Sequence, residues 1–228
     1  MSQFTQRHYQ ALLRYLKDGL RTGALKNGSK LPSEAELASI LSFSVPSLHE
    51  AMRLLELFGL VTQEADGCYR LSGDPSRSFS DLFELFLLME QTSYQDVLRL
   101  RRSIELQAIP AICENITEAE KQSLYFCLVR MMTGAREDRL ADREFHNVLV
   151  TASRDRLAAD LNQTLVQFSS PSGVGDFQEY DSEQWNHMMQ RHMQLYQAIV
   201  ANQPEHAAEA VNAHFDYLEH LWSLDSSI

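Results

Sequence analysis

The sequence predicts a mainly helical protein with an N-terminal part of three helices and a β-hairpin and a C-terminal part that is entirely helical. Two observations support this prediction. Apolar residues recur at three- and four-residue spacing along most of the chain, which is the period of a helix with one buried face. The exception is a pair of short extended segments, 60–63 and 68–71, that flank a glycine-containing turn and therefore predict a hairpin.

Local signals mark the three N-terminal helices. The first is expected over residues 5–21, which carry one apolar stripe. Ser33 is expected to start the second helix, because Glu36 three residues later completes a reciprocal capping box. Ser44 is the expected N-cap of the third helix, and Gly59 is expected to end it.

A short linker is predicted to separate two domains. The segment GDPSRS has the glycine, proline and serine content of a linker, so residues 74–78 are expected to join a domain of residues 1–73 to a domain of residues 79–228. About six helices are expected in the second domain, with one long polar gap at 169–182. Segment 82–89 is apolar on most sides and is expected to be buried or to form a subunit contact.

Charge and cysteine content limit the partners and the compartment. Residues 1–73 hold eight basic and seven acidic residues, whereas the remainder holds 12 basic and 24 acidic residues. Such an acidic C-terminal part disfavours nucleic acid, so any DNA contact is expected in the first domain. No signal peptide or membrane-spanning run is evident, and no membrane partner is expected. Three well-separated cysteines suit a reducing compartment, so a cytoplasmic location is expected.

The N-terminal segment also carries a resemblance to a known family. Residues LPSEAELASILSFSVPSLHEAMRLLELFGLV resemble the winged helix-turn-helix of the GntR family of bacterial regulators, and the match covers about residues 8–72. The resemblance implies that the third helix enters the major groove of DNA and that the hairpin, or wing, follows the DNA backbone. It also implies a homodimer on a palindromic operator, because a two-fold protein presents the same surface to both half-sites.

Several positions depart from the family pattern. Ala35, Val45 and His49 stand where the family usually has arginine, and the expected wing tip, residues 64–66, is acidic. A bidentate arginine contact discriminates between bases by about 1–3 kcal/mol, so these departures weaken the expectation of specific binding. Alternatively, the serines of the third helix only cap it and Arg53 is a solvated surface residue. The remaining candidate DNA contacts are Ser44, Ser47, His49, Arg53, Lys30 and Arg70.

The C-terminal domain has a second candidate site, made of three histidines and an aspartate. Asp142 and His146 are four residues apart and therefore share one helix face. His192 and His214 lie on two further predicted helices. Three imidazoles and a carboxylate suit zinc, nickel or manganese and leave coordination positions for water or a ligand. From the residues alone, buried histidines satisfied by hydrogen bonds are the alternative.

A second resemblance concerns this domain. The order of the four residues resembles the FCD domain that follows the winged helix in the FadR subfamily, which implies Asp142, His146, His192 and His214 as metal ligands. Segment 96–112 resembles the first long inner helix of that domain. Arg101 or Arg102 could clamp the carboxylate of an effector there, because guanidinium matches a carboxylate with two donors. The alternative is an ion pair with Glu105 or a subunit contact.

These features predict a ligand-responsive transcription regulator in which a small organic acid completes the metal shell and changes the spacing of two winged helices. Such coupling is typically worth about 1–3 kcal/mol. One alternative is a metabolite-sensing or protein-interaction protein whose winged helix no longer binds DNA specifically, as the missing arginines suggest. Another is a metalloenzyme that activates water. No enzymatic activity is expected, because Glu144 points off the face shared by Asp142 and His146.

Overall fold

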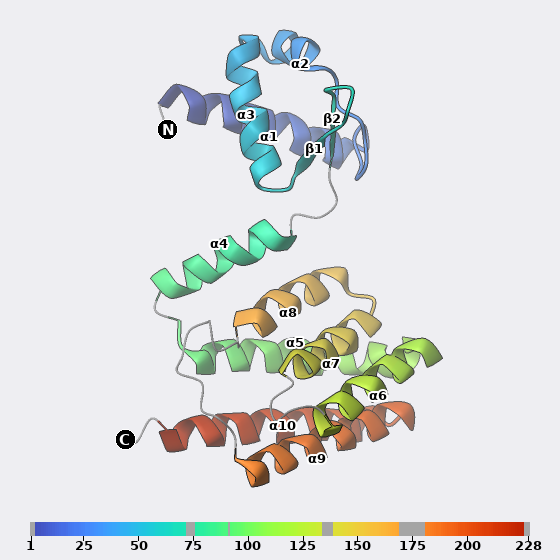
Figure 1. Cartoon of the computed structure of the whole chain (residues 1–228). Coiled ribbons are helices and arrows are strands. Elements are labelled where there is room, and N and C mark those ends of the chain that lie inside the picture. The colour runs from blue at the N-terminus through green and yellow to red at the C-terminus, as the bar shows by residue number, and fades with distance from the viewer. Residues whose placement is uncertain (1–2, 72–75, 91, 134–138, 169–180, 226–228) are drawn as a thin grey trace. The chain divides into compact units, whose positions relative to one another are not determined.

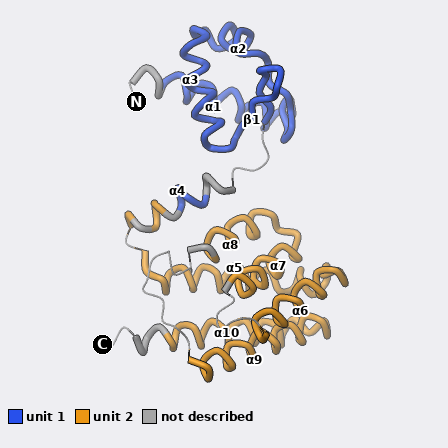
Figure 2. Tube along the Cα trace, in the orientation of Figure 1, with its two compact units in different colours: residues 1–83 blue, residues 84–228 orange. Residues whose placement is uncertain are grey.

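The computed structural model divides the chain into two compact units, residues 1–83 and 84–228 (Figure 2). Each unit has its own apolar core. None of the helices described is long and apolar enough to cross a lipid bilayer. The structure describes residues 3–71, 76–90, 92–133, 139–168 and 181–225.

The N-terminal unit begins with three helices followed by a two-stranded hairpin, as the sequence predicts (Figure 1). Its core is formed by apolar side chains of all three helices and of the hairpin, including Leu12, Leu48 and Tyr69. The elements are α1 (Gln3–Thr22), α2 (Glu34–Leu41), α3 (Val45–Leu57), β1 (Val61–Gln63) and β2 (Tyr69–Leu71).

Side-chain caps set the starts of α2 and α3 where the sequence places them. The Ser33 hydroxyl accepts from the backbone N–H of Glu36, and the Glu36 carboxylate accepts from the backbone N–H of Ser33. The Ser44 hydroxyl caps α3 by accepting from the backbone N–H of Ser47. Gly59 follows α3 with φ of 64°, a conformation that glycine adopts without steric cost.

The wing is an antiparallel pair in which Val61 lies opposite Leu71 and Thr62 lies opposite Arg70. The connector before α2 pairs with the other edge of β2. The backbone N–H of Leu31 donates to the carbonyl of Tyr69 at 2.8 Å, and Lys30 forms an isolated bridge with Arg70. This pairing therefore brings two basic residues that are distant in sequence to neighbouring positions.

Helix α4 (Ser76–Met89) begins inside the segment expected to be a linker. Residues 76–78 are helical, and residues 72–75 lie outside the part that the structure describes. Gly73 and Pro75 suggested the linker, and both precede the helix. Neither residue therefore prevents residues 76–78 from being helical.

The apolar segment 82–89 within α4 is not buried as a whole. Leu87 is buried, but the side chains of Leu82, Leu85, Phe86 and Met89 are exposed. Most of the described apolar side chains of this segment are therefore not buried within a single chain. The other half of the expectation, a subunit contact, stays a prediction.

The remainder of the C-terminal unit is helical, as predicted. Helix α5 packs against α7, α8, α9 and α10, so it lies at the centre of the bundle. The predicted polar gap falls mostly on residues 169–180, which lie outside the described residues, and α9 begins after the N-cap Asp181. The helices are α5 (Tyr94–Asn115), α6 (Glu118–Thr133), α7 (Arg139–Ala152), α8 (Arg156–Phe168), α9 (Ser182–Val200) and α10 (Pro204–Asp225).

Candidate metal centre and DNA-binding surface

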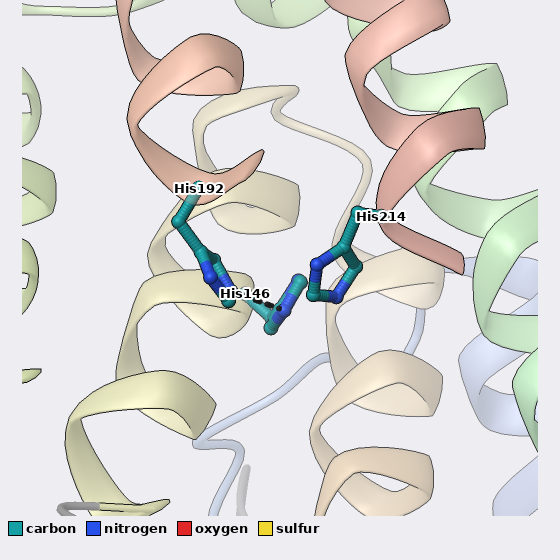
Figure 3. Close-up of side chains that lie close together, drawn as sticks. All are labelled: His146, His192 and His214. Carbon is teal, nitrogen blue, oxygen red and sulfur yellow. Dashed lines mark hydrogen bonds between the residues drawn. The ribbon is translucent and has the colours of Figure 1, made fainter. Parts of the chain in front are cut away.

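Three imidazoles converge in the interior of the C-terminal unit (Figure 3). His146 comes from α7, His192 from α9 and His214 from α10, and their exposed fractions are 0%, 1% and 2%. One nitrogen of each ring lies within 4.8 Å of the others. The Nε2 atoms of His146 and His192 are 3.3 Å apart. The structure thus brings together the three histidines that the sequence singles out.

Asp142 joins this cluster from one turn before His146 on α7. Its Oδ1 atom lies 3.0 Å from Nε2 of His192 and 3.8 Å from Nε2 of His146. The Asp142 side chain is 29% exposed, whereas the three rings are buried. The cluster therefore reaches solvent on the side of Asp142.

Oxygen atoms fix the orientation of two of the rings. Nδ1 of His146 lies 2.9 Å from Oε2 of Glu105, and Nδ1 of His192 lies 3.0 Å from the carbonyl oxygen of Met188. Because an ionised carboxylate and a carbonyl only accept, each Nδ1 carries the proton and donates it. In a neutral ring the lone pair is then on Nε2. The Nε2 atoms of both rings and the Asp142 carboxylate thus face one another, as the ligand atoms of one cation would.

His214 differs from the other two histidines because both of its nitrogens are buried with no hydrogen-bond partner among the described residues. A buried polar atom left in this state costs about 1–3 kcal/mol. Burial lowers the pKa of His214 well below its ordinary value, and the charges of His192 and His146 lower the pKa further. The His214 ring is therefore neutral at pH 7, with a lone pair available to a ligand.

The Asp142 carboxylate supplies the negative charge of the cluster. Burial alone would raise the pKa of this carboxyl, but the hydrogen bond with His192 and the neighbouring imidazoles hold the pKa well below its ordinary value. Zinc bonds of about 2.0–2.2 Å place two ligand atoms on one ion roughly 3–3.5 Å apart. The separations of 3.0, 3.3 and 3.8 Å are close to that range, so these residues fit a divalent cation.

The two arginines considered for an effector occupy different surroundings. Arg101 is 3% exposed, and its Nη2 atom lies 3.5 Å from Oε1 of Glu105. Arg102 instead donates to Asn212 at 2.8 Å and to Asp216 at 2.7 Å, which ties α5 to α10. Arg101 is therefore the arginine whose contacts lead to the cluster, and the ion pair considered as the alternative is present as well.

Glu105 is the residue whose importance the sequence did not reveal. The sequence suggested Glu105 only as an ion-pair partner of an arginine. In the structure its second carboxylate oxygen contacts His146. The sequence did hold one signal for the burial of Glu105: this residue lies at helical spacing from Leu98 and Ile109, which share the buried face of α5. An acid on such a face rarely becomes fully buried without a partner. Glu144, in contrast, forms an ion pair with Arg130 of α6.

The candidate groove contacts lie on α3 and at its N-cap. The hydroxyl oxygens of Ser44 and Ser47 are 2.8 Å apart, and Ser44 caps the helix, which is the capping role that the alternative gives to this serine. Nδ1 of His49 lies 2.8 Å from Oε1 of Glu34 on α2. Val45, His49 and Arg53 are exposed at four-residue spacing and therefore share one face of α3.

The candidate backbone contacts lie on the wing and are paired within it. Nζ of Lys30 lies 2.6 Å from Oδ2 of Asp66, and Nε of Arg70 lies 2.7 Å from Oε1 of Glu64. The hydrogen bond from Lys30 lowers the pKa of the Asp66 carboxyl. Arg70 also donates from Nη1 to the carbonyl of Gly28 at 2.6 Å. Acids of the wing tip thus already neutralise both cations.

A winged helix followed by a helical unit with a buried cluster of potential metal ligands is typical of a DNA-binding transcription regulator. Residues 8–67 match the bacterial regulatory proteins of the gntR family, and residues 96–217 match the FCD domain. The chain therefore belongs to the GntR family. Both resemblances noted in the sequence are thereby confirmed. Members of this family are transcription regulators and not enzymes; they bind operator DNA and are typically dimers.

Individual relatives cover nearly the whole chain. The HTH-type transcriptional regulator LutR of Bacillus subtilis (strain 168) is 26% identical over 213 residues, which are 90% of this chain and 96% of LutR. YcbG of the same strain, an uncharacterised HTH-type transcriptional regulator, is 25% identical over 209 residues, 89% of this chain and 82% of YcbG. The solved structure of Streptococcus agalactiae GntR has the same fold, with a TM-score of 0.65 at 21% identity, and the match covers 93% of this chain and 99% of that one.

Proposed function

We propose that this regulator responds to a small carboxylate that binds at a divalent metal held by Asp142, His146, His192 and His214. The observation that carries this proposal is the convergence of three buried imidazoles and one ionised carboxylate, with both nitrogens of His214 lacking a hydrogen-bond partner among the described residues. Zinc, nickel and manganese suit such a nitrogen-rich donor set. A bound cation would supply a positive centre with open positions for an anionic effector.

Charge near the cluster favours an anionic effector. With their carboxylates ionised, Asp142 and Glu105 together with Arg101 carry one net negative charge, and a divalent cation changes this to one net positive charge. Uncompensated charge in a buried site is costly, so a metal-loaded cluster favours a monoanion. Arg101 is the proposed effector contact, because its planar donor pair matches a carboxylate and Arg102 is engaged with α10.

Effector binding is proposed to shift the helical bundle and thereby the spacing of two winged helices in a homodimer. In this proposal α3 contacts the major groove of a palindromic operator through Ser44, Ser47, His49 and Arg53. Lys30 and Arg70 contact DNA phosphates, for which each must exchange its acidic partner within the wing. A coupling of about 1–3 kcal/mol between the two sites is typical of such regulators.

A second candidate function is a metabolite-sensing or protein-interaction protein that has lost specific DNA binding. The charge of the DNA-facing surface favours it, because Val45 and His49 replace arginine on the exposed face of α3 and the wing cations are paired. An anisotropy titration at low salt distinguishes the two functions. Binding to the upstream region of its own gene above that of random DNA supports the regulator, and equal binding supports the second function.

Metal analysis combined with thermal shift tests the proposed sensor. The purified full chain is expected to retain a divalent metal, and removal by a chelator is expected to lower its melting temperature. A ligand that binds only the folded state stabilises it by mass action. A carboxylate effector should therefore raise the melting temperature of the metal-loaded protein but not that of the metal-free protein. A chain that retains no metal and shows no shift with zinc, nickel or manganese contradicts the proposal.

A further inference from the structure

We infer that Glu105 is a positioning residue that holds the ring of His146 so that Nε2 faces the cluster. This inference rests on the proposed metal binding and adds a residue outside the four proposed ligands. The contact is direct, because Oε2 of Glu105 lies 2.9 Å from Nδ1 of His146. Both side chains are buried, at 0% and 1% exposure, so bulk water does not compete for this hydrogen bond.

A purely structural role for Glu105 is energetically unfavourable. Removing a carboxylate from water costs several kcal/mol, and a well-packed apolar residue in its place often stabilises a protein as much or more. The neighbours of Glu105 on the inner face of α5, such as Ala108 and Ile109, are apolar. A buried acid on this face is therefore better explained by what its charge does to His146.

The hydrogen bond to Glu105 affects His146 in two ways. It fixes the tautomer with the proton on Nδ1, which leaves the lone pair on Nε2 for a metal. An anionic acceptor also makes the ring more basic and hence a stronger ligand. His192 has a neutral partner at its Nδ1, the carbonyl oxygen of Met188, and both nitrogens of His214 lack a partner among the described residues. His146 therefore has the strongest support of the three rings.

Arg101 holds Glu105 in place from the preceding turn of α5. Its Nη2 atom lies 3.5 Å from Oε1 of Glu105, which leaves the other carboxylate oxygen for His146. The guanidinium group also lies over the ring of Phe215 on α10, 5.5 Å from the ring centroid. Since Phe215 follows His214 directly, Arg101 and Glu105 connect the elements that carry two of the three histidines.

Zinc affinity of the metal-free full chain tests the inference through competition with a chromophoric chelator. Glu105→Ala is expected to weaken zinc binding about 10–100-fold, the usual effect of losing an outer-shell partner. Glu105→Gln is expected to lose less, because its amide oxygen still accepts from Nδ1–H. The matched control is Glu120→Gln, since Glu120 bonds to Thr117 and Arg154 rather than to a histidine. Its zinc affinity should equal that of the wild type.

A second measurement reports the position of the proton, which a merely structural role would not change. In a two-bond proton–nitrogen correlation spectrum of the metal-free full chain, neutral His146 should have the Nδ1–H tautomer. The His146 signals are assigned by their loss in His146→Asn. In Glu105→Ala the ring should shift toward the Nε2–H tautomer, the form that prevails in water.

The outcomes separate this inference from the proposed function. Wild-type zinc affinity together with an unchanged tautomer in Glu105→Ala overturns the inference. Should Glu105→Ala not fold, the wild-type tautomer decides, because an Nε2–H ring at His146 is incompatible with donation to Glu105. A wild-type chain that binds no zinc contradicts the proposed metal site, while an Nδ1–H tautomer in that same chain still supports the role of Glu105 in orienting His146.

Discussion

The histidine cluster and the wing both gather ionisable side chains, but they satisfy these groups in opposite ways. In the cluster, both nitrogens of buried His214 lack a hydrogen-bond partner among the described residues, and two Nε2 atoms face the Asp142 carboxylate. On the wing, Lys30 and Arg70 each form an ion pair with an acid of the same hairpin. Unsatisfied buried atoms are costly unless a ligand binds them, whereas exposed ion pairs exchange at little cost.

This difference shows why the two sites need different tests. A ligand of the cluster adds interactions that the chain alone lacks, so its binding should appear directly as stability. DNA at the wing replaces existing ion pairs with phosphate contacts, so its binding should depend on salt and on the competing acids.

The largest effect is expected from the buried arginine beside the cluster. Arg101→Met leaves the Glu105 charge with less compensation, and breaking a buried ion pair typically costs about 3–5 kcal/mol. Arg102→Met is the matched control, because Arg102 is 25% exposed, and it should cost only about 1 kcal/mol. Urea unfolding followed by tryptophan fluorescence measures both, since both tryptophans, Trp185 and Trp222, belong to the C-terminal unit. Equal losses for the two variants would contradict the buried-pair argument.

Removal of a proposed metal ligand should abolish stabilisation by metal. Zinc at about 100 times its Kd stabilises a folded protein by about 2.7 kcal/mol, which is roughly 5–10 °C for a chain of this size. His214→Ala should lose this increase, because the coordination then has three protein ligands at most. His206→Ala, an exposed histidine on the same helix, should keep the increase. Calorimetry with and without zinc makes the comparison, and an undiminished increase in His214→Ala would exclude that residue as a ligand.

Neutralising the acids of the wing should strengthen DNA binding. In the double variant Glu64→Gln, Asp66→Asn, the side chains of Lys30 and Arg70 no longer have carboxylate partners within the wing. Affinity for duplex DNA at low salt should rise roughly tenfold, and the log–log salt slope should steepen by about 0.9 for each added phosphate contact. Anisotropy titrations over a salt series measure both quantities. The reverse change, Lys30→Gln with Arg70→Gln, should weaken binding. If neither variant differs from the wild type, the wing makes no backbone contact.

The smallest effect is expected at the ion pair between Arg154 and Glu120, which includes no residue of the histidine cluster or of the wing. The hydrogen bond from Arg154 lowers the pKa of Glu120 to about 2 from an ordinary 4.5. Because the folded-state pKa lies below the unfolded one, this stability is present above pH 4.5 and is lost as the pH falls toward 2. The Glu120 side chain is 22% exposed, so solvent screening leaves about 1 kcal/mol. Urea unfolding should show wild type and Glu120→Gln differing at pH 7 and converging only as the pH approaches 2. A difference that is constant with pH would rule out this ion pair as its source.

The sequence predicted much of the fold and the identity of the clustered residues. Caps at Ser33 and Ser44, the hairpin, and the helical C-terminal unit all appear where local patterns placed them. The residues themselves suggested Asp142, His146, His192 and His214 as a candidate site, and the resemblance to the FCD domain implied that they are metal ligands. Spacing alone placed only Asp142 and His146 on one helix face. The partners of these residues were not predictable, since a helical period tells which residues are buried and not which helix lies opposite.

By itself, the sequence determined features that depend on residues within a few positions of each other, such as helix starts, apolar faces and the shared face of Asp142 and His146. Only the tertiary structure decided contacts that span long stretches of chain: His146 with His192 over 46 positions, His146 with Glu105 over 41, and Lys30 with Asp66 over 36. The physical reason is that the backbone hydrogen bonds of a helix and the side-chain bonds that cap it join residues a few positions apart, whereas these contacts depend on how helices and strands pack. Packing arises from the summed burial of many apolar side chains, to which no single motif corresponds.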